Sequence, residues 1–339
     1  MIRKIYSALA LTLISASALA GAPGNQMVAP TGTPVIALGS MGYWSLGIEA
    51  LYVRSTAPQF QYAQIASNTT PENKLSNQIV GNSYQTGFEA DATYHFVGND
   101  RDVTLAYTHV DMDDSHTSSI VGSETFAEPF GLLPTPAFLD HVDQIKGSTD
   151  NLYNAADLVF GQHMAVGKVL DIHPFGGLRY ADLNSRNNST YYNDPTVADH
   201  IQATAQMTSH FQGLGPRAGV GATLYLNNTF SLIGTFGGAL EVGYDNPETT
   251  LQSNGDLPVN DELNKNWYIV PELDAQIGIN FQHCFSQLTA LNVQLGYQAV
   301  NYFNAVEDDY QDMVNVNSNV NRQAFSFQGP FLRVQLNVA

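Results

Sequence analysis

The stretch NWYIVPELDAQIGINFQ (Asn266–Gln282) decides the fold, because apolar and polar side chains alternate along it almost without exception. Successive side chains of a β-strand point to opposite faces of the sheet. One face is therefore wholly apolar, while the other carries Glu272, Asp274 and several amides. Its 17 residues far exceed the ~5–6 of a typical soluble strand. A strand of this length with one apolar and one charged face is typical of a barrel whose outer wall contacts lipid.

The same alternation predicts ten strands in all. They cover residues 43–55, 85–96, 103–111, 150–164, 169–182, 210–226, 230–246, 266–282, 288–304 and 325–338. The connections between them alternate between short and long. The short ones are 97–102, 165–168, 227–229 and 283–287, and the long ones are 56–84, 112–149, 183–209, 247–265 and 305–324. This arrangement predicts an all-β fold, a transmembrane antiparallel β-barrel of about ten strands with short periplasmic turns and long external loops.

The N-terminus predicts export. Arg3 and Lys4 precede an apolar run over residues 5–14, and Ala18-Leu19-Ala20 has the pattern of a cleavage site. We therefore expect a signal peptide over residues 1–20, an N-terminal periplasmic segment over 21–42 and the barrel domain over 43–339. No later stretch contains the ~18 apolar residues of a spanning helix. A soluble β-sandwich also alternates, but export, strand length and loop asymmetry favour the outer membrane.

Charge and cysteine content exclude several functions. The chain carries 31 acidic against 13 basic residues and a formal net charge of −18, which argues against nucleic acid as a partner. The single cysteine, Cys284, excludes an internal disulfide and falls beside His283 in a predicted periplasmic turn. One Cys and one His do not make a metal site, although a free thiol could cross-link two chains. We expect no cofactor.

The inward-facing positions contain charged side chains of both signs. The predicted lumen-lining residues are Glu49, Glu89, Asp91, Asp157, Arg179, Arg217, Glu241, Glu272, Asp274 and Arg333. In an open lumen this excess of carboxylates would favour cations. In a closed barrel the same side chains would pair and fill the interior. A barrel of about eight strands can be filled by side chains and one of about sixteen encloses a water channel, so ten strands lie between these two cases. Seven acidic residues against three arginines favour a hydrated, cation-preferring path.

Catalysis has one candidate location. His109, Asp111, Asp113, Asp114 and His116 cluster where the third predicted strand should leave the membrane. Such a group could activate a water, but it needs a second acidic partner across the rim. We therefore expect no enzyme and no catalytic residues. The acidic loops lack the spacing of an EF-hand, so we also expect no metal site and interpret them as solvated.

Four prolines fall inside predicted strands. Pro174, Pro216, Pro271 and Pro330 lack a backbone donor, and a closed barrel has no edge strand on which its loss would be harmless. We expect bulges or local breaks in the hydrogen-bond ladder at these positions.

The chain resembles the Legionella-type major outer membrane protein family. The matching stretches, in order, are WSLGIEALYVRS (44–55), GFEADATYHF (87–96), PFGGLRYADLN (174–184), FQGLGPRAGVG (211–221), IVPELDAQIG (269–278), GYQAVNYFNA (296–305) and QGPFLRVQL (328–336). The resemblance implies an abundant, surface-exposed barrel of the cell outer membrane that forms water-filled diffusion pores. No ligand-binding residues carry over, because the matching stretches are wall segments.

These observations favour a porin that passes small hydrophilic solutes and prefers cations. The expected partners are outer-membrane lipid, lipopolysaccharide, and small ions and solutes, and a homo-oligomer is compatible with the resemblance. The alternative is a barrel with a closed lumen that acts as a structural protein or adhesin through its acidic surface loops.

Overall fold

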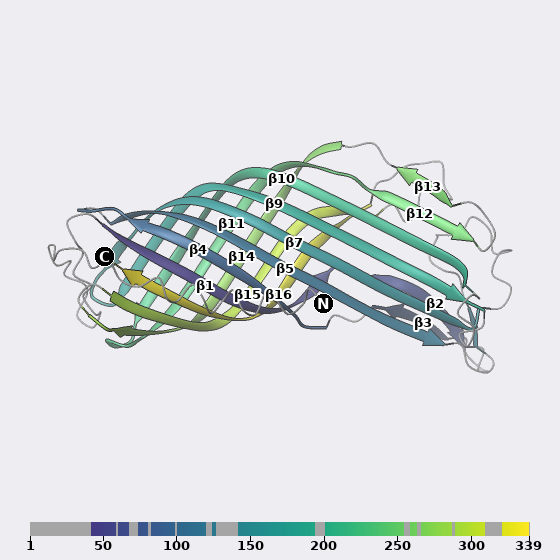
Figure 1. Cartoon of the computed structure of the whole chain (residues 1–339), viewed down its shortest axis with the longest axis horizontal. Helices are drawn as coiled ribbons and strands as arrows, with labels where there is room; N and C mark the ends of the chain where they lie inside the picture. Colours follow the sequence, from purple (N-terminus) through teal and green to yellow (C-terminus); the bar gives the residue numbers. More distant parts are fainter. Residues whose placement is uncertain are drawn as a thin grey trace.

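A computed structural model describes the chain over residues 42–58, 60–67, 74–80, 83–98, 100–119, 124–126, 142–193, 201–253, 258–262, 266–286, 289–308 and 321–338. The predicted signal peptide and nearly all of the predicted N-terminal segment lie outside these residues. Ten long strands form a barrel (Figure 1). They are β1 (Tyr43–Ala57), β4 (Gln85–His95), β5 (Arg101–Ser119), β7 (Gln144–Gln162), β9 (Leu170–Tyr192), β10 (Ile201–Tyr225), β11 (Phe230–Asp245), β14 (Asn266–Cys284), β15 (Thr289–Asp308) and β16 (Asn321–Val338).

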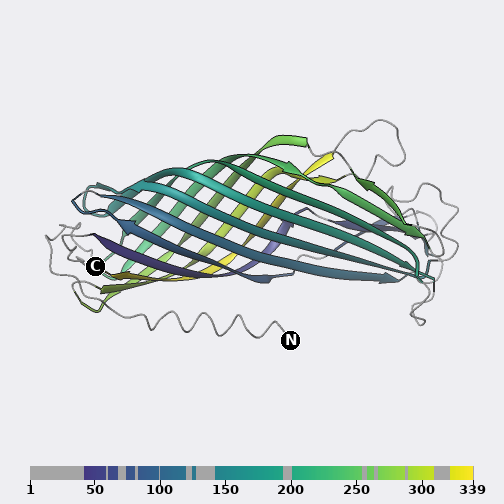
Figure 2. The same ribbon diagram turned by 45° about the horizontal axis from the view of Figure 1, so that its top comes forward.

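Every neighbouring pair in the barrel is antiparallel. The order runs β1-β4-β5-β7-β9-β10-β11-β14-β15-β16, and β16 pairs back to β1 with Glu49 opposite Arg333. The strands are steeply tilted, as closure of a sheet into a barrel requires (Figures 1 and 2). These observations confirm the predicted all-β antiparallel barrel of about ten strands. We call the end with the short connections the turn end and the opposite end the loop end.

The outer wall is apolar and exposed along the middle of the strands. Ile277 on β14 is 70% exposed, and Leu295 on the neighbouring β15 is 62% exposed. Trp44 and Trp267 lie near strand ends, where aromatic side chains suit a membrane interface. Among the described residues, no helix has the length and apolar character needed to cross a bilayer.

An arginine in this wall will destabilise the barrel. We expect Ile277→Arg to lower the free energy of unfolding in lipid by about 2–4 kcal/mol, because its charge would face hydrocarbon. The matched control is Gln252→Arg on β12 (Glu248–Ser253), an exposed position beyond the barrel wall, where a change within about 0.5 kcal/mol is expected. Urea titration in vesicles measures both values, and equal losses would contradict the assignment of a lipid face.

At the loop end the barrel strands continue beyond the predicted boundaries. β5 and β7 stay paired to Ser119 and Gln144, so parts of the predicted 112–149 loop are strand. β9 and β10 likewise extend into the predicted 183–209 loop. Sequence reasoning placed these strand boundaries too close to the turn end. The extensions lose the regular apolar face that marks a lipid-facing strand.

Short strands add to the loop end and the turn end. β2 (Gln61–Ser67), β3 (Lys74–Ile79) and β6 (Glu124–Phe126) form a separate three-stranded sheet. A cluster of buried side chains joins this sheet to the extended wall; it includes Tyr62, Ile145, Tyr191 and Met207. β12 pairs with β10 and with β13 (Val259–Glu262), and at the turn end β8 (Met164–Val166) pairs with β9.

The four strand prolines interrupt the ladder without shifting it. Pro174, Pro216, Pro271 and Pro330 each keep a register partner in one neighbouring strand, namely Val220, Leu178, Leu240 and Tyr297. On the other side of each proline, the ladder of paired residues is either interrupted or ends. The register of the strands does not shift at these positions. Of the two expected alternatives, bulges or local breaks, the described strands show local breaks at the prolines. Each residue of an antiparallel ladder bonds mainly to one side, so a missing N–H affects one neighbour.

Candidate functional site

The interior of the barrel is the candidate functional site, and its first feature is a layer of ion pairs. Arg179 on β9 donates two hydrogen bonds to Asp157 on β7, from Nε at 2.7 Å and from Nη2 at 2.5 Å. Its Nη1 donates to Glu272 on β14 at 2.7 Å. Arg217 on β10 lies 2.6 Å from Asp274 and 3.3 Å from Glu272. Two arginines thus hold three carboxylates in one buried network.

A second cluster surrounds Arg333 on β16. Its guanidinium lies 2.9 Å from Asp91 on β4, 3.8 Å from Glu89 and 4.0 Å from Glu49 on β1. Gly47 makes this approach feasible, because a Cβ there would collide with the carboxylate of Asp91. Gln276 on β14 donates to Gln298 at 2.9 Å and to Glu49 at 3.5 Å, which connects β14 to this second cluster.

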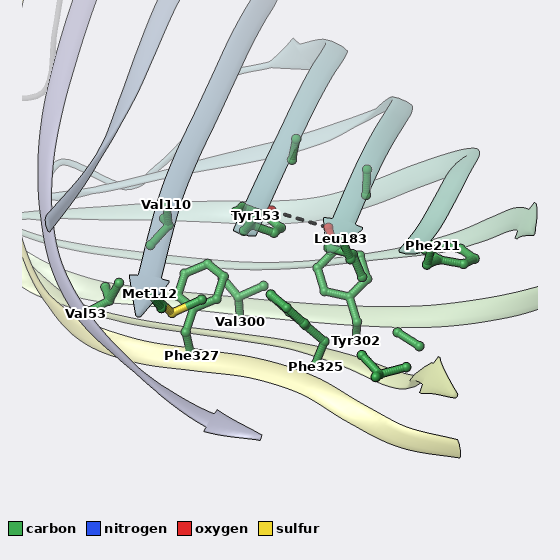
Figure 3. Close-up of a cluster of buried hydrophobic side chains, with 14 of the residues drawn as sticks. Val53, Val110, Met112, Tyr153, Leu183, Phe211, Val300, Tyr302, Phe325 and Phe327 are labelled. Atoms are coloured by element: carbon green, nitrogen blue, oxygen red, sulfur yellow. Dashed lines mark hydrogen bonds between the residues drawn. The ribbon is translucent and has the colours of Figure 1, made fainter. Parts of the chain in front are cut away.

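A layer of buried aromatic and aliphatic side chains also lies inside the barrel (Figure 3). Tyr153 on β7 and Tyr302 on β15 meet with their hydroxyls 3.3 Å apart. Five steps around the barrel separate these two strands, so the pair spans the lumen from wall to wall. The ring of Phe327 packs against that of Tyr153 with centroids 4.9 Å apart, and Phe325 adds a third ring. All four residues are at most 2% exposed.

Both layers follow from the two-residue period of a strand. On β7, Asp157 is followed towards the loop end by Ala155 and Tyr153, and on β16 Arg333 is preceded by Phe331 and Phe327 on the same face. The charged residues occupy one level, and the apolar residues two to six positions further on occupy the next. Sequence reasoning missed the second layer because it searched the inward face only for charges.

Acidic side chains outnumber basic ones among the predicted lumen residues. All ten sequence-predicted lumen residues are buried or partly buried inside the barrel, and they comprise seven carboxylates and three guanidinium groups. Glu241 on β11 is 0% exposed, and neither of its carboxylate oxygens has a hydrogen-bond partner within the described chain. A buried carboxylate of this kind needs a proton, a cation or water as its partner. Among the described lumen residues, carboxylates therefore outnumber guanidinium groups by four.

The residues considered as a catalytic candidate, His109 to His116, do not form a compact cluster at a strand end. The five residues lie along β5, which continues to Ser119 instead of ending near Asp111. Each side chain with a described contact uses a different partner: His109 bonds to Asn154 at 2.8 Å, His116 to Tyr62 at 2.6 Å, and Asp114 accepts from the backbone N–H of Ser83 at 2.7 Å. The alternation of a strand puts Asp114 and His116 on the face opposite to His109, Asp111 and Asp113, so the five side chains do not converge.

Cys284 was also misplaced. It is the last residue of β14 and pairs with Ala290 on β15, whereas sequence reasoning put it and His283 in a turn. Its thiol is free and partly exposed. The alternating strand pattern simply runs two residues further than expected.

Comparison with known families decides the identity of the fold. The family model of the Legionella pneumophila major outer membrane protein precursor matches residues 40–338, which covers the whole barrel. The chain belongs to this family. The resemblance seen in the wall segments is thus confirmed, and the major outer membrane protein family places the chain in the cell outer membrane. No curated protein matches the sequence.

Several solved structures match this family member at low identity and with TM-scores below 0.5. The outer membrane protease OmpT from Escherichia coli is 11% identical with a TM-score of 0.40, and the match covers 87% of this chain and 96% of that one. Ail, the attachment invasion locus protein of Yersinia pestis, is 9% identical with a TM-score of 0.22 over 88% and 99% of the two chains. The Pseudomonas putida toluene transporter TodX is 7% identical with a TM-score of 0.27 over 95% and 99%.

Proposed function

We propose that this outer membrane protein forms a narrow, cation-preferring pore for small hydrophilic solutes. The excess of seven carboxylates over three guanidinium groups in the lumen carries the proposal. Unpaired charge is costly to bury in a low-dielectric interior. Cations entering from water would offset that cost without any rearrangement of the wall, and Glu241 offers two carboxylate oxygens for them.

The aromatic layer limits what such a pore can pass. Tyr153 and Tyr302 meet across the lumen, so the narrowest level accommodates ions and water rather than large solutes. In this proposal the ion-pair layer selects the charge of the solute, and the tyrosine contact limits its size. No group in the lumen is needed for catalysis, and we propose no enzymatic activity.

The proposed setting follows from the two ends of the barrel. The turn end faces the periplasm and the loop end faces outwards, since external loops are the longer ones in barrels of this class. The exposed apolar wall contacts lipid, and lipopolysaccharide surrounds the loop end. Several copies could assemble through the same wall.

Single-channel recording in a planar bilayer tests the proposal. The purified, refolded protein should give small discrete current steps, and a salt gradient should give a reversal potential of the sign expected for cations. Folding is checked by the shift in gel mobility on heating. A folded barrel with anion-selective steps would contradict the proposed selectivity.

Two lumen carboxylates give a sharper prediction. The double substitution Glu272→Gln and Asp274→Asn reduces the excess of carboxylates from four to two, so cation preference should fall measurably. The control is Glu248→Gln on β12, an exposed carboxylate outside the barrel ring, which should leave the reversal potential unchanged. Unchanged selectivity in the folded double variant would show that these residues do not line the conducting path.

A second candidate function rests on the tyrosine contact. If the two layers close the lumen completely, the barrel is a structural or adhesive protein, and its acidic external loops carry the function. The 3.3 Å contact between Tyr153 and Tyr302 favours this reading. A folded, heat-modifiable protein that never conducts would support it and overturn the pore.

A further inference from the structure

A group of histidines and aspartates gathers at the turn end, away from the ion-pair layers. His95 ends β4, Asp102 lies at the start of β5, and His163 lies between β7 and β8. One potential ligand atom from each residue can be chosen so that all three lie within 4.8 Å of one another. The two ends of the β4–β5 turn and the end of β7 thus converge on one small volume.

The donors are held in position by further contacts. Asp171 on β9 bonds to His163 Nδ1 at 2.6 Å, which leaves Nε2 of the same ring directed at Asp102 Oδ2, 3.5 Å away. His173 contacts the same Asp102 oxygen through Nε2 at 2.8 Å and stacks on His163 with ring centroids 4.1 Å apart. Ser45 contacts His95 Nε2 at 3.0 Å. A histidine fixed by a carboxylate and a carboxylate fixed by a second donor are the usual supports of a metal site.

Two details favour a ligand over a purely structural network. The Asp102 side chain is 1% exposed, yet its Oδ1 has no hydrogen-bond partner within the described chain. The wall also makes room for the group, because a Cβ at Gly161 would collide with His173 and lie 2.9 Å from Asp102 Oδ1. His163 is 38% exposed at its side chain, so an ion can reach the group from the solvent at this end.

We propose that His95, Asp102 and His163 bind a divalent transition-metal ion of the zinc class, with Asp171 and His173 as positioning residues. Two imidazole nitrogens and one carboxylate oxygen suit Zn²⁺, which accepts nitrogen and oxygen ligands in a tetrahedral set. Bonds of ~2.0–2.1 Å in that geometry place neighbouring ligand atoms roughly 3.4 Å apart, close to the Nε2 to Oδ2 separation seen here. Ca²⁺ and Mg²⁺ prefer oxygen ligands and do not fit this set.

The bound ion would tie the turn end together. It would connect β4, β5 and the β7–β8 connection at the end of the barrel where the described connections are short. Because an ion that binds only the folded barrel stabilises it by mass action, Zn²⁺ should raise the denaturation midpoint. This effect is independent of conduction through the lumen.

The experiment is titration of the refolded, tag-free protein with ZnCl₂ by calorimetry. The expected result is one saturable site per chain that MgCl₂ does not occupy. His163→Ala should abolish it, and Asp171→Asn should weaken it by roughly 10–100-fold, as for other supporting carboxylates. The matched control is His210→Ala on β10, whose ring bonds to a single carboxylate, Asp182, at 2.9 Å and belongs to no group of three.

Each outcome decides the proposal. Loss of the site in His163→Ala with retention in His210→Ala supports it, provided both variants keep heat-modifiable folding. The absence of a saturable site in the wild-type protein would overturn it and leave a hydrogen-bond network that only anchors the strand ends. Equal loss in both variants would overturn it as well, because binding would then be nonspecific.

Discussion

Replacing both Tyr153 and Tyr302 with alanine will raise the single-channel conductance severalfold. Their side chains meet across the lumen at 3.3 Å and are almost fully buried, so their removal clears the narrowest level of the interior. The charged layer below it stays intact, and cation preference should therefore persist. Planar-bilayer recording in the same salt measures both quantities against the wild-type protein.

The matched control is Tyr297→Ala on β15. This tyrosine lies on the same strand as Tyr302, but its side chain faces outwards and is 40% exposed. Its removal should leave conductance unchanged. If the double variant is folded and conducts no better than the wild-type protein, the aromatic layer does not set the size of the path.

Arg179→Met will cost about 3–5 kcal/mol of unfolding free energy. The guanidinium is hydrogen-bonded to Asp157 and Glu272, and its loss leaves buried carboxylates without their main counter-charge. The hydrophobic part of methionine fills similar space, so the loss comes from charge rather than from a cavity. Urea unfolding of the refolded barrel in vesicles, followed by tryptophan fluorescence, gives the value.

Two further variants separate charge from packing. Arg186→Met removes an exposed arginine from the same strand and should change the unfolding free energy by about 0.5 kcal/mol or less. Adding Glu272→Gln to Arg179→Met removes one orphaned charge and should recover part of the loss. A double variant less stable than the sum of its single changes would contradict this account of the network.

The sequence predicted the wall of the barrel well. The lipid-facing pattern around Trp44, Phe236 and Ile277 located all ten barrel strands, because strand period and lipid contact leave a strong apolar signal. It failed where that signal ends. β9 and β10 continue through Asn187 and Gln206 with mixed side chains, and their continuation depends on pairing with each other, which no local pattern reveals.

The candidate site was only half predictable. The alternation of inward and outward positions along each strand predicted the ten charged lumen residues. It could not show that Arg179 joins β7 to β14 or that Arg333 faces β4, since these pairings depend on barrel curvature. The histidine group at the turn end was missed altogether. His95 and Asp102 face each other across the turn between β4 and β5, but His163 follows β7, and no local pattern reveals that the pairing of β5 with β7 brings it beside them.

The unequal strand lengths have a mechanical consequence. β10 has 25 residues, and at about 3.3 Å per residue and a tilt of roughly 40° it rises on the order of 60 Å, more than twice the ~25 Å apolar band. β1, with 15 residues, rises far less. One side of the barrel therefore extends further beyond the membrane than the other and forms a raised edge. The β2-β3-β6 sheet packs against this extended wall. In the proposed orientation, with the loop end outwards, this raised edge is the part of the described barrel that lies furthest from the membrane.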